Sequence, residues 1–135
     1  STYMNILTGR IDSIIVNGDL SIVKVKVGSV VFSTIVIDTP ETAPYLRIDN
    51  EVKVIFKETE VILGVGDMSG ISLRNKMKGK VSHIESDTLL SKVSIATEMG
   101  TITSIITSNA VKQLQIVLDM ELTAMVKTNE LMLSK

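Results

Sequence analysis

The sequence lacks several residues on which common protein sites depend. Its 135 residues include no cysteine, no tryptophan, one histidine, two prolines, two phenylalanines and two tyrosines. Without cysteine there are no disulfide bonds, thiolate metal ligands or cysteine nucleophiles. No hydrophobic run reaches the roughly 18 residues that a membrane-spanning helix needs, and no charged-then-apolar leader opens the chain. The sequence therefore predicts a soluble, cytoplasmic protein.

Charge and hydrophobic content narrow the function further. The chain carries 14 basic and 15 acidic residues, which gives a net charge of −1. This balance argues against a protein that holds nucleic acid by general electrostatics, which needs a basic excess. Hydrophobic residues make up 44% of the chain, so a core can form. Because aromatic residues are only 3%, we expect that core to consist of valine, isoleucine, leucine and methionine.

The chain repeats itself at an offset of 70 residues. The identical pairs at this offset include Asn5/Asn75, Gly9/Gly79, Asp49/Asp119, Glu51/Glu121 and Lys57/Lys127. A long repeat used only twice indicates a duplicated small domain rather than a solenoid. Residues 64–70 contain three glycines, which interrupt the apolar pattern and indicate a linker. We expect residues 1–66 to form a first domain and residues 67–135 a second.

Each half is predicted to consist mainly of strands. Val23, Val25 and Val27 alternate with lysines, a period of two that buries one face of a strand. Residues 39–42 (Thr-Pro-Glu-Thr) resemble the start of a helix, and residues 108–114 are their counterpart in the second half. The predicted fold class is therefore all-β, with two tandem five-stranded barrels that each carry one short helical element. Barrels are favoured because closing a sheet hides its edges.

Side chains for catalysis are scarce. His83 has no second histidine to accompany it, so metal catalysis and a serine–histidine pair lack their parts. The repeated acidic pairs Asp49/Asp119 and Glu51/Glu121 fall at a turn before a strand, where we expect solvated loop positions. No glycine-rich phosphate loop precedes a helix. We therefore expect no enzymatic activity, no catalytic residue, no cofactor and no metal held by protein side chains.

One polar cluster in the second half has the chemistry of an anion site. Ser72-Leu73-Arg74-Asn75 is followed by lysines at positions 76, 78 and 80. Arg74 offers a planar fork of donors, Ser72 adds a hydroxyl, and nearby backbone N–H groups can complete an anion nest. Taken alone, these residues favour a solvated basic strand face, with an anion site as the alternative.

Four segments in order resemble one known family and change that balance. They are residues 72–75, residues 77–81, residues 106–114 and residues 126–133, and residues 5–11 and 56–64 repeat the pattern in the first half. Together they resemble the molbindin domain (Mop, or TOBE-like), which opens on Ser-(Ala/Gly)-Arg-Asn and carries Lys-(Ala/Ser/Thr) before its last apolar run. The resemblance covers essentially the whole chain. It implies barrels related to the oligonucleotide/oligosaccharide-binding (OB) fold that bind molybdate or tungstate between domains.

The resemblance also implies which residues bind the oxyanion. Ser72, Arg74 and the Leu73 backbone N–H would contact it, and Asn75 would hold the loop. The rest of the site, from another strand or subunit, would be Thr107, Lys127 and the Thr128 backbone, with Lys57 as a weaker candidate. Two residues depart from the family pattern. Met4, within Thr2-Tyr3-Met4-Asn5, stands where the first half would need arginine, and Leu73 replaces a small residue.

A binding role follows from the resemblance. It implies intracellular sensing, storage or transport regulation of molybdate or tungstate by a homo-oligomer, either a dimer or a trimer. It implies no contact with a membrane or with nucleic acid, and any DNA-binding or ATPase domain would lie outside this chain. Two alternatives stay open. One is an OB-like module for single-stranded nucleic acid or oligosaccharide, which needs aromatic stacking platforms. The other is a structural oligomerisation domain with a decayed anion site.

Overall fold

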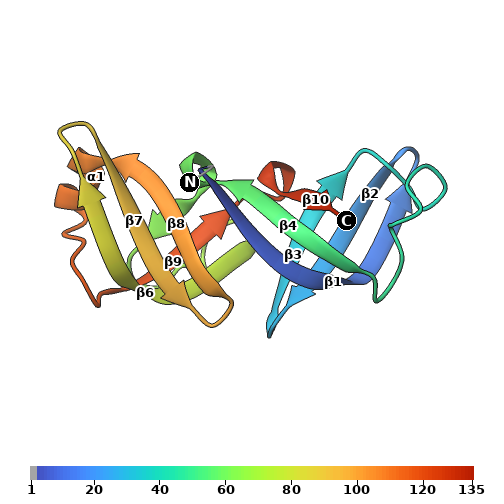
Figure 1. Ribbon diagram of the computed structural model, residues 1–135, viewed down its shortest axis with the longest axis horizontal. Coiled ribbons are helices and arrows are strands. Elements are labelled where there is room, and N and C mark those ends of the chain that lie inside the picture. The colour runs from blue at the N-terminus through green and yellow to red at the C-terminus, as the bar shows by residue number, and fades with distance from the viewer. Residues whose placement is uncertain (1–2) are drawn as a thin grey trace.

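A computed structural model describes residues 3–135 and places two twisted sheets side by side (Figure 1). The first half supplies β1 (Met4–Asn17), β2 (Leu20–Val27), β3 (Val30–Val36), β4 (Glu51–Lys57), η1 (Glu58–Glu60) and β5 (Ile62–Gly64). The second half supplies β6 (Asn75–Ser86), β7 (Leu90–Thr97), β8 (Gly100–Thr107), α1 (Ser108–Gln113), β9 (Glu121–Val126), η2 (Thr128–Glu130) and β10 (Met132–Ser134). This arrangement confirms the predicted all-β class with tandem five-stranded OB-like barrels.

Alternating burial explains why these segments are strands. In β2, Val23 and Val25 are fully buried, while Lys24 and Lys26 on the opposite face are exposed. The same alternation runs along β1 and β4, so one face of each strand joins the core and the other meets solvent. The core is built mostly from aliphatic side chains, together with Phe32 and Phe56.

The two halves repeat the same backbone irregularities. A bulge interrupts the β1–β2 ladder between Ile11 and Ser13, and its counterpart lies between Val81 and His83. Asp49 and Asp119 have φ angles of 70° and 67°. Aspartate tolerates this left-handed conformation better than most residues. The backbone N–H of Asp49 donates to Ile11 O, and that of Asp119 donates to Val81 O, both at 2.8 Å. These acidic residues therefore form a turn whose backbone is hydrogen-bonded to the bulge.

Each sheet takes its last strand from the other half of the chain. The order of the first sheet is β10-β4-β1-β2-β3, and that of the second is β5-β9-β6-β7-β8. Leu63 of β5 pairs with Ala124 of β9, and Leu133 of β10 pairs with Val54 of β4. The boundary between residues 66 and 67 separates the two repeats along the chain, but it does not separate the two sheets in space. The assignment of residues 1–66 and 67–135 to two domains stays a prediction.

Buried asparagine side chains tie the two sheets together. The Asn75 amide accepts a hydrogen bond from Ser33 N at 2.7 Å and donates one to Ser33 O at 2.9 Å. Asn5 forms the same pair of bonds with the backbone of Thr103, at 2.9 and 2.8 Å. A side-chain amide that bonds both backbone groups of one residue replaces a missing strand neighbour, and this explains the repeated asparagine.

The helical elements differ between the halves. The helical element predicted over residues 108–114 is α1, and Thr107 Oγ1 caps it by accepting a hydrogen bond from Ala110 N. Residues 39–42 form only a single turn, in which Thr42 and Ala43 donate to Thr39 O. Pro44 stops that turn from extending, because proline disfavours helical backbone at the residue before it. The short helical element of the first half is therefore η1. No helix within residues 3–135 is long and apolar enough to span a membrane.

We expect Asn75→Ala to lower the free energy of unfolding by roughly 2–4 kcal/mol, because it leaves the backbone N–H and C=O of Ser33 without their partners. Chemical denaturation measures the change. Asn129→Ala is the matched control, because Asn129 is exposed and surface substitutions typically change stability by about 0.5 kcal/mol or less. Equal effects from the two variants would show that the Asn75 bonds contribute nothing.

We also expect residues 1–66 and residues 67–135, expressed separately, not to fold as monomers. Each fragment holds one strand that pairs only with the other fragment and lacks the strand that completes its own sheet. Mixing the two should restore the native circular dichroism spectrum. A stable monomeric fragment in size-exclusion chromatography would contradict this expectation.

Candidate functional site

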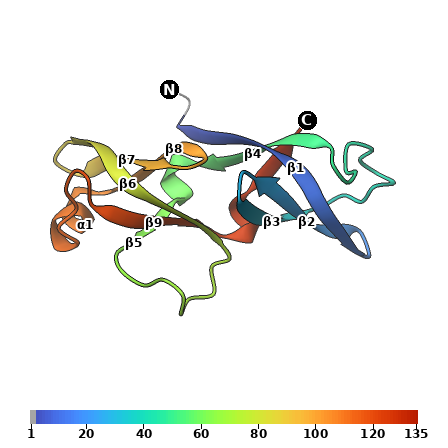
Figure 2. The same ribbon diagram turned by 90° about the horizontal axis from the view of Figure 1, so that it is seen from below.

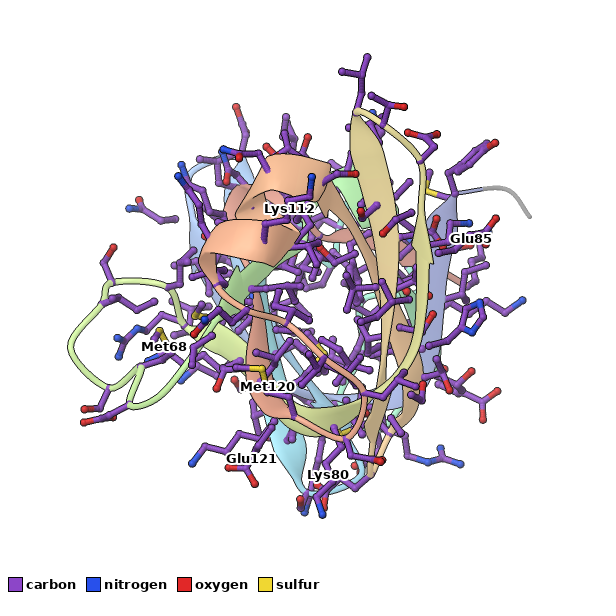
Figure 3. The ribbon with its side chains drawn as sticks, turned by 90° about the vertical axis from the view of Figure 1, so that its left-hand side faces the viewer. Met68, Lys80, Glu85, Lys112, Met120 and Glu121 are labelled. Atoms are coloured by element: carbon purple, nitrogen blue, oxygen red, sulfur yellow. The ribbon has the colours of Figure 1, made fainter. Side chains whose placement is uncertain are left out.

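The segment before β6 is a loop that projects from the body of the molecule (Figure 2). Met68 lies on it (Figure 3), and the Met68 carbonyl accepts a hydrogen bond of 2.6 Å from Lys76 Nζ. Within the loop, the backbone N–H and hydroxyl of Ser69 donate to the Asp67 carboxylate at 2.9 and 3.0 Å. These bonds, with a smaller contribution from Lys78 and Lys76, hold the pKa of Asp67 below its usual range. The loop therefore has a defined shape and carries a fixed negative charge.

Arg74 lies at the end of this loop and braces it from within. Its Nη2 donates to Ile71 O at 2.7 Å, and its Nε donates to Ser72 O at 3.2 Å. The side chain is exposed. A guanidinium has five N–H donors, so this arrangement holds the loop and leaves three donors for an external acceptor.

The structure brings most of the predicted site residues to one end of the second sheet. Asn75 of β6 pairs with Val126 of β9, and the ladder between the two strands starts at that pair. Arg74 comes directly before β6 and Lys127 directly after β9, and both are exposed. Thr128 follows as the first residue of η2. Arg74 and Lys127 therefore flank the same end of the ladder, and Ser72, Leu73 and Thr128 lie within two residues of them along the chain.

Thr107 is not part of this group within one chain. It pairs with Leu90, next to the pair of Ser86 with Ser91. Ser86 ends β6, whereas Asn75 begins it. The Thr107 hydroxyl already caps α1. A contribution of Thr107 to the site of another subunit stays a prediction.

The lysines of β6 are not a free basic face. Lys76 is half-buried and bonded to the loop. Lys78 lines one shallow hollow with Asp67 and Glu121, and a second with Glu98. Lys80 pairs with Glu121 across β6 and β9, and both side chains project at the same end of the barrel (Figure 3). Carboxylates therefore offset much of the positive charge of the β6 lysines. Arg74 and Lys127 are not among the residues that these carboxylates face.

The remaining sequence candidates lie elsewhere. His83 is exposed on β6, and among residues 3–135 no cluster of three or more histidine or acidic residues could hold a metal ion. Lys57 is exposed and pairs with Met4 at the end of the first sheet. Thr2, which belongs to the same segment as Met4, lies outside the described residues.

Sequence reasoning missed one charged group next to Lys57. Glu58 is buried, and its Oε1 lies 3.3 Å from Lys92 Nζ. The Lys92 ammonium also lies over the Tyr3 ring, 5.1 Å from its centroid. The repeat held a signal for this group, because glutamate stands at position 58 where the second half has Thr128.

Comparisons with known proteins agree with this geometry. Residues 71–133 match the model of the TOBE domain. A crystal structure of the cytoplasmic molybdate-binding protein ModG, with molybdate bound, is 25% identical to this chain. The match covers 96% of this chain and 94% of that one, with a TM-score of 0.88.

A shorter structure matches about one half of the chain. MopII from Clostridium pasteurianum is 34% identical, over 49% of this chain and 100% of its own length, with a TM-score of 0.47. No curated protein sequence matches this chain. The second half carries the domain match and the ordered Ser72–Asn75 segment, and the ModG fold spans both halves. The second half of the chain is therefore a TOBE domain, and the chain as a whole has the tandem fold of a Mop/TOBE-like molbindin.

Proposed function

We propose that this protein binds molybdate through the end of its second sheet. The observation that carries the proposal is the juxtaposition of Arg74 and Lys127 just beyond the Asn75–Val126 pair. The match to ModG, described as a molybdate-binding protein, covers nearly the full length of both chains and supports the same ligand. Tungstate, which has the same charge and shape, is proposed as a second ligand.

The donors at this end suit an oxyanion that only accepts hydrogen bonds. Arginine and lysine are donors without acceptors, and hydrogen bonds between charged groups are stronger than neutral ones. The backbone N–H groups of Leu73 and Thr128 and the Ser72 hydroxyl would supply the remaining bonds. We propose that Arg74 keeps its bonds to the loop when the anion binds, so that the loop is formed beforehand.

The proposed role is binding rather than catalysis. Storage, sensing and regulation of transport all need the same reversible binding, and we propose the protein acts in one of them inside the cell. Among the described residues no cluster of three or more histidine or acidic residues could hold a metal ion.

An OB-like module for single-stranded nucleic acid or oligosaccharide is less well supported. Such modules stack bases or sugars on exposed aromatic side chains. Phe32 and Phe56 are buried in the core and Tyr45 is half-buried, which leaves Tyr3 as the exposed aromatic side chain of the chain. One exposed aromatic ring is a poor stacking platform.

We further propose that the protein is a homo-oligomer, either a dimer or a trimer. Thr107 lies away from the Ser72–Asn75 loop, so a site that includes it would need a second copy of the chain. The first sheet also carries an exposed apolar row, in which Ile22 of β2 pairs with Ile15 on one side and Ile35 on the other. A second copy is the occupant we propose for this row.

We expect Arg74→Met to weaken molybdate binding by about 2–3 kcal/mol, because it removes charged hydrogen bonds to the anion. That loss corresponds to roughly 30- to 150-fold in dissociation constant, measured by isothermal titration calorimetry. Arg47→Met is the matched control, because Arg47 is exposed and lies outside the site. Unchanged affinity in folded Arg74→Met would place the anion elsewhere.

Excess molybdate should also raise the melting temperature of the wild-type protein, because a ligand that binds only the folded state stabilises it by about 2.7 kcal/mol at a hundredfold excess over its dissociation constant. Sulfate at the same concentration should do much less. Equal shifts of the melting temperature from the two anions would show that the effect is general ionic screening. That result would favour the alternative of a structural oligomerisation domain with a decayed anion site.

Ile22→Lys should lower the mass of the particle in sedimentation velocity, because it places a charge in the apolar row. Lys24→Ile, on the same exposed face of β2, should not. A wild-type particle of 14.7 kDa with full affinity for molybdate would contradict the proposed assembly.

A further inference from the structure

The first half contains a counterpart of the proposed site, and a buried carboxylate stands at it. The offset of 70 residues relates Lys57 to Lys127 and Glu58 to Thr128. Both segments follow the strand that pairs with the start of β1 or β6, and both begin a 3₁₀ helix. What differs is the side chain at the first residue of that helix.

Glu58 is a buried carboxylate with one oxygen that receives no hydrogen bond. Its side chain is 7% exposed, and no described group donates to its Oε1. The ammonium of Lys92 lies 3.3 Å away as an ion pair. Burying an unbonded charged oxygen costs free energy, and Lys92 is the group that compensates it. The counterpart of Lys92 is Ile22, which is neutral.

The backbone of the first half is also closed at this point. Glu58 N donates to Tyr3 O at 2.9 Å, and the β1–β4 ladder reaches the pair of Met4 with Lys57. Tyr3 has a φ of 59°, a conformation that costs free energy for a residue with a Cβ. The N–H that the proposed site would use is therefore already taken in the first half.

The second half is open at the same position. The β6–β9 ladder starts one pair later, at Asn75 and Val126. Thr128 N has no backbone acceptor within residues 3–135 equivalent to Tyr3 O, and Leu73 is not among the residues with positive φ. Position 128 carries no charge. The two halves thus present the same framework, once with an internal anion and once without.

We infer that the Glu58 carboxylate acts as an internal anion that occupies the first half's counterpart of the oxyanion site and prevents molybdate from binding there. The inference rests on the proposed function and limits it to one site per chain. Arginine at position 4 would not restore the lost site by itself, because a guanidinium beside Glu58 would pair with that carboxylate.

The test counts bound molybdate per chain by equilibrium dialysis and elemental analysis. The wild-type protein should bind one equivalent. Glu58→Thr, which copies the second half and frees Lys92, should bind a second equivalent. Glu60→Thr is the matched control on η1 and should bind one. In Glu58→Thr/Arg74→Met the second equivalent should persist while the first weakens, which shows that the two sites are separate.

A folded Glu58→Thr variant that binds the same number of equivalents as the wild type would overturn the inference. If the wild type binds none and Glu58→Thr binds one, the proposed site at Arg74 fails while the internal anion stands. If neither binds molybdate, both fail.

Glu58→Ala provides a second route if Glu58→Thr does not fold. It removes both the charge and the bulk of the side chain, so it should also admit a second equivalent. Crystals of this variant soaked in tungstate should show an anomalous peak beside Lys92 Nζ. A folded Glu58→Ala without that peak, and with one equivalent bound, would overturn the inference.

Discussion

The fold depends on the exchange of β5 and β10 between the two sheets. Each is a three-residue strand, too short to hold a sheet edge by itself, and each is pinned by the segment before it. Thr34 Oγ1 of β3 donates to Leu131 O just before β10, and Ser104 Oγ of β8 donates to Val61 O just before β5. With the amide bonds of Asn5 and Asn75, these contacts make the two sheets one cooperative unit. A substitution that destabilises one barrel is therefore expected to destabilise the other.

The same exchange explains why the two halves present different sites. In the second sheet β5 and β6 lie on opposite sides of β9. The loop from Val65 to Arg74 therefore has to pass β9 to connect β5 to β6. That loop has room for Ser72 and for a braced Arg74. In the described part of the first half, β1 follows Tyr3 directly, and the Tyr3 carbonyl closes on Glu58. Both halves keep the framework, while the second holds a loop and the first a buried carboxylate that pairs with Lys92 of the second half.

Much of the fold follows from local sequence patterns. The alternation at Val23, Val25 and Val27 predicts a half-buried strand, and the offset of 70 predicts two copies of it. Asn75 was predicted to hold the loop, which stays a prediction, while its amide bonds the backbone of Ser33 in the other sheet. Asp49 and Asp119 were interpreted as solvated loop residues. Their side chains are exposed, but their left-handed backbone is what the repeat preserves. The exchange itself could not be predicted, because the pairing of a three-residue strand is set by distant contacts.

Which residues come together at the site was harder to predict from the sequence. Ser72, Leu73, Arg74, Lys127 and Thr128 come together because β6 and β9 are neighbours, and the repeat supports that pairing. Thr107 was grouped with them through the resemblance alone, and within one chain it lies at the other end of the sheet. Glu58 carries no motif, and its burial follows from the packing of η1 against β8.

The exchanged edge strands also govern when the protein can fold during synthesis. Leu133 must find Val54, and Ala124 must find Leu63, so the closing contacts join residues that are 79 and 61 positions apart. Contacts of such long range slow folding, and the first sheet cannot close until β10 has been synthesised. Until then β4 presents an open edge to its surroundings. An open edge pairs readily with another chain, so two copies made on neighbouring ribosomes can exchange their β10 strands before each has completed its own barrel.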